Sequence, residues 1–547
     1  MVWRRIGTHA IFASLDEAAT AGSSPDPVAG TVAAGCSGAR PLPRGPPSLP
    51  PAGTSAASTA ETTRALVRPG FSLGCTPVTT PSDSADLVVL GAGPAGLAAA
   101  WRAARSGRSV VLLERAPTVG GMAAGFDVAG VRVDHGSHRL HPSTAPAILA
   151  DLTGLLGDDL QLRQRNGRLR IGDAWVGFPL RPAELVRRLP PALLARMVYD
   201  AATAPARRRS TPPASYADAL RRGLGPGLYQ ALYAPFAEKL WGLSGDGVDA
   251  EQARRRVTAD TPWKIVAKML RRSENGQGRM FHYPCHGFGQ LTEAVAQAAV
   301  DAGARIEVST EAVTVRPGDD GVGVRTRSGT EITAGHVFST VPLTVLARIV
   351  EPGPAPAVLA DAAGLRFRAM VLVYLVLEQR RRWSPFDAHY LPGTGTPITR
   401  VSEPANYRDS TDDPTDRTVL CAEIPCTPDD AVWRSSDDDL AARVGSDLTR
   451  AGLPAVRPTQ VVTRRLRHVY PVYDLGYGAR LAGLDAWADA VARVTTFGRL
   501  GLFAHDNTHH AFAMAYDAVD ALSSGGAFNE RAWSAARERF TGHVVED

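Results

Sequence analysis

The chain has 547 residues, of which 44% are hydrophobic and 21% charged, a balance typical of a globular protein with about two to four domains. A net charge of +5, without a basic patch interleaved with aromatic residues, gives no indication of nucleic-acid binding. The five cysteines form neither a disulfide framework nor a paired C-x-x-C metal site, so we expect a reduced, cytoplasmic compartment. No stretch approaches the roughly 18 consecutive apolar residues of a membrane-spanning helix.

Residues 1–84 differ in composition from the rest of the chain. They are rich in Ala, Pro, Gly, Ser and Thr and have no sustained apolar period. Such a segment buries too little apolar surface to offset the entropy that is lost when a chain becomes ordered. We therefore predict that residues 1–84 are disordered.

The next segment, D-L-V-V-L-G-A-G-P-A-G at 86–96, is an apolar strand that runs directly into G-x-G-x-x-G. This pattern indicates a dinucleotide-binding turn. Gly91 permits the tight turn, Gly93 lets the backbone approach a pyrophosphate, and Gly96 lets the following helix pack closely on the strand. The helix is expected at 94–106, and its first residues, Pro94 and Ala95, face the phosphates.

A second strand is expected at 109–113, and it ends in Glu114. This carboxylate follows Gly91 by 23 residues, which is where a dinucleotide-binding unit places the acceptor for a ribose hydroxyl. Together, the strand, turn, helix, strand and carboxylate predict an adenine-dinucleotide site.

A glycine pair extends the loop after this carboxylate. The chain reads R-A-P-T-V-G-G-M from Arg115, so Gly120 and Gly121 keep it from turning directly into a second helix. This region resembles the flavin amine oxidase and protoporphyrinogen oxidase superfamily, in which FAD lies along the loop. The resemblance makes FAD the expected cofactor instead of a nicotinamide, and it adds Arg115 and Met122 to the predicted cofactor-binding residues.

Further segments carry the same resemblance across about 85–525 of the chain. They are D-H-G-S-H at 134–138, F-P-L at 178–180, Y-A-P-F-A-E-K-L-W-G at 233–242, Y-P at 283–284 with G-F-G at 287–289, and V-F-S-T-V-P at 337–342. G-R-L-G-L-F at 498–503, followed by D-N-T-H-H at 506–510, is similar to the second cofactor motif of the protoporphyrinogen-oxidase-like branch. The resemblance implies that Gly498 and Arg499 contact the cofactor and that Val313 faces its adenine end.

The resemblance implies an α/β fold with a discontinuous Rossmann-type FAD-binding domain, into which an α+β substrate-binding domain is inserted. The FAD-binding domain is expected at 85–150, 285–345 and 495–547, and the substrate-binding domain at 151–284 and 346–494. The first substrate segment has mostly helical patterns, with amphipathic runs at 182–189 and 192–202. The second has strand patterns at 365–377 and 418–424.

Near the C-terminus, Asn507 or Thr508 is expected to cap a helix over 509–522. The resemblance implies that this helix start points at the pyrimidine edge of the flavin. Its dipole would then stabilise negative charge on the reduced ring. The motifs that contain His138 and His510 border the isoalloxazine in the resembled family, so both are candidates for lining the catalytic pocket.

Two groups of histidines raise the question of a metal site. They are His135, His138 and His141, and His505, His509 and His510. Gly136 makes a shared helical face improbable for the first group, and Asp506 is the carboxylate that accompanies the second. We expect these histidines to contact flavin or substrate or to pack, and predict no metal site.

Residues 163–209 contain eleven arginines and three acidic residues. Three interpretations stay open for this Arg-rich region. It binds a carboxylate or phosphate of the substrate, it contacts anionic lipid as a peripheral membrane surface, or it is a solvated face.

These patterns favour an FAD-dependent oxidoreductase that dehydrogenates a C–C or C–N bond of a hydrophobic or anionic small molecule by hydride transfer to flavin. One alternative is a non-redox isomerase resembling UDP-galactopyranose mutase. That branch shares the style of the C-terminal motif, but it carries Asn after the glycine pair, where this chain has Met122 and Ala123. A flavoprotein without turnover is the other alternative, and the presence of both cofactor motifs and a full-size substrate domain argues against it.

Overall fold

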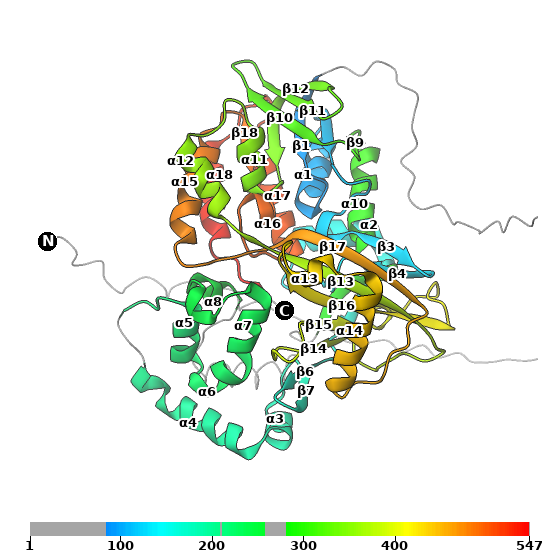
Figure 1. Ribbon diagram of the computed structural model, residues 1–547. Helices are drawn as coiled ribbons and strands as arrows, with labels where there is room; N and C mark the ends of the chain where they lie inside the picture. Colours follow the sequence, from blue (N-terminus) through cyan, green and yellow to red (C-terminus); the bar gives the residue numbers. More distant parts are fainter. Residues whose placement is uncertain (1–83, 208–210, 257–279, 546–547) are drawn as a thin grey trace, which may run out of the picture. The chain divides into compact units, whose positions relative to one another are not determined.

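The computed structural model describes residues 84–207, 211–256 and 280–545 (Figure 1). The segment predicted to be disordered lies outside the described residues, apart from Ser84, which begins the first strand. No helix of the described residues is long and apolar enough to cross a membrane.

The first sheet has seven strands in the order β10-β11-β12-β1-β2-β9, and β18 pairs with the end of β12 beyond β11. β1 lies between two parallel partners, β12 and β2, and its apolar run is buried because helices cover both faces of the sheet. The strands are β1 (Ser84–Leu90), β2 (Val110–Leu113), β9 (Arg305–Glu307), β10 (Ala312–Pro317), β11 (Val322–Thr326), β12 (Glu331–Ser339) and β18 (Val494–Thr496).

The helices form one layer on each face of this sheet (Figure 1). The first layer packs on Leu87 and Val89 of β1 and consists of α1 (Pro94–Arg105), α2 (Pro146–Leu156), α10 (Gly289–Asp301), α17 (Thr508–Ala521) and α18 (Glu530–Phe540). The second packs on Val88 and Leu90 and consists of α11 (Leu343–Ile349), α12 (Pro356–Gly364) and α15 (Tyr477–Asp489). The alternation of β1 side chains between the two cores follows from the two-residue period of a strand.

The second sheet also has seven strands, in the order β17-β13-β16-β15-β14-β6-β7. One face packs on α14 (Asp437–Arg450) and the other on the hairpin of β3 (Gly125–Val128) and β4 (Val131–Asp134), which follows the predicted cofactor loop. Its strands are β6 (Gly167–Ile171), β7 (Ala174–Phe178), β13 (Phe367–Glu378), β14 (Ala388–Tyr390), β15 (Arg400–Ser402), β16 (Arg417–Cys426) and β17 (Gln460–Pro471).

Most remaining helices lie between β7 and β8 in the chain. They are α3 (Pro182–Arg188), α4 (Pro191–Arg207), α5 (Tyr216–Gly223), α6 (Pro226–Leu228), α7 (Ala234–Trp241) and α8 (Glu251–Arg256). α3 and α4 pack on β6 and β7, whereas α5, α7 and α8 share a separate core. The strand β8 (Met280–Pro284) then pairs with β5 (Leu160–Gln164). α13 (Ala431–Arg434) and α16 (Gly498–Gly501) are short.

The structure confirms the α/β fold, and the predicted helices at 94–106, 182–189, 192–202 and 509–522 appear as α1, α3, α4 and α17. Two details differ. Residues 167–178, within the segment predicted to be mostly helical, form β6 and β7. The second substrate segment begins with α12 before its first strand, β13. The domain boundaries remain a prediction, although the first sheet draws its strands from 84–113, 305–339 and 494–496.

A buried lysine ties the helical region to the second sheet. Lys239 of α7 is 9% exposed, and its Nζ donates hydrogen bonds to the carbonyl oxygens of Leu391 and Ile398. At the end of the same helix, Arg368 of β13 donates to the carbonyls of Lys239 and Leu240 at 3.2 and 3.1 Å. A cation at a helix C-terminus also meets the negative end of the helix dipole.

Stability should depend on the protonation of Lys239. Burial lowers its pKa to about 7, against about 10.4 in an unfolded chain. Between these values the unfolded chain binds a proton that the folded protein lacks, so stability rises with pH across this window. We expect the unfolding free energy of the wild type, measured relative to Lys239→Met by urea titration, to rise by up to about 1.4 kcal/mol per pH unit. A difference that stays flat from pH 7 to 10 would contradict this pKa.

Candidate active site

The first glycine loop lies at the carboxyl end of β1. Gly91 has φ +99°, and a Cβ there would lie 2.6 Å from Oγ1 of Thr340, which itself donates to the carbonyl of Leu90 at 2.9 Å. A Cβ on Gly96 would lie 1.9 Å from the carbonyl oxygen of Gly91, so the start of α1 touches the turn. Around Gly93, in contrast, a Cβ would meet no atom within 4 Å. The loop therefore leaves open space at the residue predicted to face the pyrophosphate.

The carboxylate of Glu114 lies beside this loop. One oxygen accepts a hydrogen bond from the amide of Ala92 at 2.7 Å, and the other accepts from the amide of Ala116 at 2.7 Å. The neighbouring Arg115 is exposed. The amide of Thr310 donates to the carbonyl of Glu114 at 2.8 Å. This bond holds the segment just before β10 beside Glu114, and Val313 is the second residue of β10.

The second glycine pair packs against the first loop. The amide of Gly120 donates to the carbonyl of Ala92 at 2.7 Å, and a Cβ on Gly121 would lie 3.1 Å from Cα of Gly93. Gly120 and Gly121 have φ +103° and +55°, so both need the left-handed backbone that glycine adopts readily. Met122 follows in the same short turn and is half-buried.

The C-terminal motif reaches the same place from the other end of the chain. Gly498 has φ +82°, and a Cβ there would lie 3.1 Å from the Cβ of Ala95. The guanidinium of Arg499 lies over the ring of Tyr470 at 5.4 Å. α17 begins at Thr508 with Asn507 as its N-cap, as the sequence predicted.

The first glycine loop, the end of β2 with Glu114, the second glycine pair and the C-terminal motif together have the features that FAD binding requires. They supply open space along the glycine backbone, a carboxylate at the end of β2, and a second loop that continues from the first. The starts of α1 and α17 add the partial positive charge that favours a phosphate or another anion. The individual contacts of Gly91, Gly93, Pro94, Ala95, Gly96, Glu114, Arg115, Gly120, Gly121, Met122, Val313, Gly498, Arg499, Asn507 and Thr508 with the cofactor remain predictions.

The chain leads from the second loop into a polar segment. His135 donates through its amide to the carbonyl of Ala124 at 3.0 Å and through Nδ1 to the carbonyl of Gly121 at 3.2 Å. His138 donates from Nε2 to the carbonyl of His135 at 3.1 Å and stacks on Phe288, with the ring centres 5.3 Å apart. Burial lowers the pKa of His138, so its imidazole is neutral near pH 7.

A network of buried charges continues from this segment into the second sheet; we call it the arginine network. Arg400 binds both oxygens of Glu423 at 2.9 and 2.8 Å and the carbonyl of Ser137 at 3.2 Å. Arg139 pairs with Asp387 at 3.3 Å. It also donates to the hydroxyls of Tyr390 and Tyr407, at 3.3 and 3.2 Å. The two cations are thus matched by two buried carboxylates, Asp387 and Glu423.

His510 caps the start of α17. Its Nδ1 accepts a hydrogen bond from the amide of Asn507 at 3.1 Å and completes a capping box at the start of α17. Its ring stacks on His543 at 4.1 Å, and His543 donates to the buried Asp506 at 2.9 Å. A direct contact of His510 with substrate or flavin remains a prediction.

The structure groups the histidines differently from the sequence expectation. In the described residues, the sets whose ligand atoms approach closely enough for a metal ion are Asp506, His510 and His543, and Asp159, Cys285 and His286. Hydrogen bonds within the protein already use Nδ1 of both His510 and His543. We therefore assign no metal to the set of Asp506, His510 and His543.

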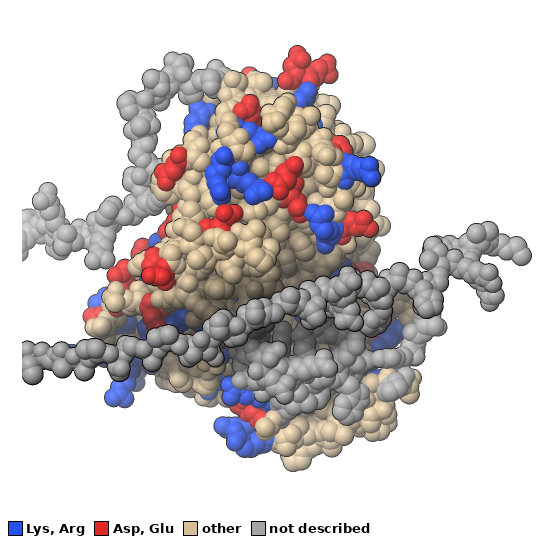
Figure 2. Space-filling model, turned by 180° about the vertical axis from the view of Figure 1, so that it is seen from behind, with Lys and Arg blue, Asp and Glu red and all other residues tan. Residues whose placement is uncertain are grey.

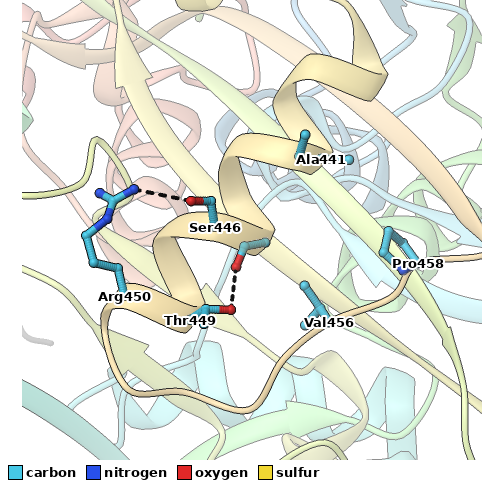
Figure 3. A pocket seen from close by; sticks show the side chains of 8 residues that line it. Ala441, Ser446, Thr449, Arg450, Val456 and Pro458 are labelled. Carbon is cyan, nitrogen blue, oxygen red and sulfur yellow. Dashed lines mark hydrogen bonds between the residues drawn. The ribbon is translucent and has the colours of Figure 1, made fainter.

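A separate cavity of about 620 Å³ opens in the second sheet's helical cover (Figure 3). It lies between α14 and the segment that follows it, where Ser446, Arg450 and Val456 line it. The guanidinium of Arg450 donates to the hydroxyl of Ser446 at 3.3 Å. None of its lining residues belongs to the glycine loops or the arginine network, so it lies outside the predicted cofactor site.

The Arg-rich region is divided among several environments. Arg163 pairs with Asp409, Arg170 with Asp173 and Arg196 with Asp200. Arg187 and Arg188 are exposed at the end of α3 and form no ion pair with a described acid.

Sequence reasoning missed several residues of this site. They are Arg139, Thr340, Tyr390, Asp387, Arg400, Tyr407, Glu423 and His543. Thr340 belongs to the noted strand at 337–342, so that resemblance was its only signal. The arginine network joins residues more than 240 positions apart, and no local pattern marks such pairs.

Comparisons with known proteins bear on this geometry. The family model described as "Flavin containing amine oxidoreductase" matches residues 94–521, most of the chain. The chain belongs to this family. Its cofactor is accordingly FAD. The protein named "Putative flavin-containing monoamine oxidase AofH" from Mycobacterium tuberculosis is 43% identical over 91 residues, which is 17% of this chain and a fifth (20%) of that protein.

Solved structures share the fold at low sequence identity. A reduced UDP-galactopyranose mutase superposes with a TM-score of 0.71 at 20% identity, covering 84% of this chain and 100% of that one. A "Putative protoporphyrinogen oxidase from Exiguobacterium sp. 255-15" superposes with a TM-score of 0.60 at 19% identity, covering 84% and 99%. Such likeness supports the fold of the FAD-dependent superfamily.

Substitutions of Gly93 and Gly96 in the first loop should have different effects. Gly93 has φ −75° and ψ 178°, which valine also adopts, so Gly93→Val should keep the melting temperature of the FAD-free protein. Its side chain fills the open space, and FAD affinity should fall by about one to two orders of magnitude, the equivalent of an overpacking cost of about 1–3 kcal/mol. Flavin titration measures the loss.

Gly96→Ala is the matched variant, because its Cβ collides with the carbonyl of Gly91. The FAD-free protein should then lose about 1–3 kcal/mol of stability, seen as a lower melting temperature. If Gly93→Val unfolds the protein while Gly96→Ala leaves its melting unchanged, the two roles are assigned wrongly.

Proposed function

We propose that the protein is an FAD-dependent oxidoreductase that removes two hydrogens across a C–C or C–N bond of a hydrophobic or anionic small molecule. The observation that carries the proposal is the continuity of the site. Hydrogen bonds of His135 join the second cofactor loop to His138, and Arg400 of the arginine network donates to the carbonyl of Ser137 in the same segment. A substrate between the two would contact the reactive part of the cofactor and a preorganised polar wall.

FAD, when bound, supplies a two-electron acceptor for hydride. Loss of hydride from one substrate atom must be matched by loss of a proton from its neighbour. His138 can accept that proton, because donation from Nε2 to a carbonyl oxygen leaves the lone pair on Nδ1. The same hydrogen bond and the stacking on Phe288 hold the ring in one orientation. Oxygen or a quinone would serve as the final electron acceptor.

The arginine network supports the proposed substrate class. Nε of Arg139 is buried and has no hydrogen-bond partner in the described residues, so this guanidinium can still donate to a ligand. The half-buried ring of Tyr390 beside it offers apolar surface. A small molecule with both an apolar body and an oxygen acceptor matches these two features.

A flavin-dependent isomerase is the second candidate, since the fold superposes on a UDP-galactopyranose mutase with a TM-score of 0.71. The two functions make opposite demands on the cofactor. An oxidoreductase must be reoxidised in every turnover, whereas an isomerase of this kind works with flavin that stays reduced.

An anaerobic assay should separate these functions. The FAD-loaded protein is mixed without oxygen with porphyrinogens, polyprenyl compounds, amines and UDP-sugars, and the visible flavin absorbance is followed. We expect one class to bleach the flavin and oxygen or a quinone to restore it. Isomerisation of a UDP-sugar that occurs only after dithionite reduction would replace the oxidoreductase by the isomerase. If no compound bleaches the flavin and no UDP-sugar is isomerised after reduction, the protein is the flavoprotein without turnover.

Replacement of His138 tests the proposed base. His138→Gln should slow flavin bleaching at saturating substrate by about 10²–10⁴-fold while FAD content stays constant. Burial lowers the pKa of His138 below 6.5, so the wild-type rate should fall only at more acidic pH, and this acid limb should vanish in the variant. The exposed His286 provides the control, and His286→Gln should keep both the rate and its pH profile. An acid limb that persists in His138→Gln would exclude this base.

A further inference from the structure

Helix α4 is apolar on two opposite sides. Its inner side places Leu193, Leu194 and Met197 on the core formed with β6 and β7. Its outer side carries Val198 and Tyr199, which are 69% and 60% exposed. The other exposed positions of this helix are Pro191, Ala192, Ala195, Arg196, Ala202 and Ala206, so Arg196 is the one charged residue among its described exposed positions. A surface helix normally has charged or polar residues on its outer side, so this pattern is typical of a helix that something else covers.

The charges around this face have one sign. Val186 of α3 is 68% exposed and is followed by the exposed Arg187 and Arg188, which form no ion pair with a described acid. Arg196 of α4 lies over the ring of Tyr199 at 5.7 Å. We call these six residues the α3–α4 surface: Val186, Arg187, Arg188, Arg196, Val198 and Tyr199. Three of the six large hydrophobic side chains that are exposed in the described residues belong to it.

Arg196 pairs with the buried Asp200 at 3.5 Å, whereas Arg187 and Arg188 have no ion-pair partner among the described acids. Glu184 accepts a hydrogen bond from the amide of Gly177 at 3.0 Å. Asp200 is fully buried and accepts from the amide of Gly227 at 2.7 Å. At the lower end of Figure 2, where Figure 1 has α3 and α4, Lys and Arg side chains, with an acidic side chain between them, border a surface of uncharged residues.

We propose that the α3–α4 surface docks on an anionic lipid bilayer. Val186, Val198 and Tyr199 would enter the interface, while Arg187, Arg188 and Arg196 would lie at the level of the lipid phosphates, with their apolar stems beside the acyl chains. A second copy of the chain fits less well. A two-fold contact through this surface would bring the arginines of one copy against those of the other. Such a contact would lie at the surface of the bilayer and would be peripheral.

Sedimentation with lipid vesicles tests the proposal on the full-length, FAD-loaded protein. We expect binding to phosphatidylcholine vesicles that contain phosphatidylglycerol, weaker binding at high salt, and no binding to phosphatidylcholine alone. Arg187→Gln with Arg188→Gln should weaken binding by about fivefold for each arginine removed. Val198→Ser with Tyr199→Ser keeps the charge but should also weaken binding, because a bilayer takes up apolar side chains and a simple ion exchanger does not.

The control is Arg380→Gln with Arg381→Gln, which removes the same charge from an exposed loop after β13. It should bind as the wild type does, and all variants should keep their FAD and melting temperature. Equal loss of vesicle binding in the control and in the α3–α4 variants would overturn the proposal. Wild-type protein that does not bind anionic vesicles would also overturn it. A dimer that dissociates in the Val198 and Tyr199 variant would assign the surface to a second copy. Loss of binding only on deletion of residues 1–83 would place the lipid contact there.

Discussion

The contact between Gly96 and the carbonyl of Gly91 is the constraint on which the site depends. With a projected Cβ only 1.9 Å from that oxygen, α1 can start this close to β1 only if residue 96 has no side chain. The close start leaves the backbone at Gly93 open and turns both polar groups of Ala92 outward. The amide of Ala92 binds Glu114, and its carbonyl binds Gly120. One glycine thus positions Glu114, the predicted ribose acceptor, and the second loop together.

The arginine network has a different energetic basis. Two guanidinium groups are costly to bury, and pairing with Asp387 and Glu423 offsets that cost without guaranteeing a net gain in stability. Hydrophobic residues of similar size would often serve the core as well. The network therefore makes most sense as a fixed polar wall. Its donors are already oriented, so a substrate bound there would not have to order them.

The sequence predicts the cofactor loops well because each of their constraints is local. The turn at Gly91, the positive φ of Gly120 and the cap at Asn507 all depend on neighbours within a few residues. The arginine network could not be predicted, since Arg400 meets Ser137 only after two sheets have formed. The strands at 167–178 were missed for a related reason. They are short, and although they pair with each other locally, β6 joins the second sheet only through β14, a segment more than 200 residues away.

The C-terminal helix shows how one residue's structural role limits its chemical role. His510 accepts a hydrogen bond from the amide of Asn507, so one of its nitrogens already satisfies the start of α17. That start must stay in register if its dipole is to stabilise negative charge on a reduced flavin. A proton-transfer role would change the protonation of His510 and thereby disturb the cap. His138 has no such conflict, because its hydrogen bond to a carbonyl uses the protonated nitrogen and leaves the other free to accept. The geometry therefore favours His138 for proton transfer and His510 for holding the helix.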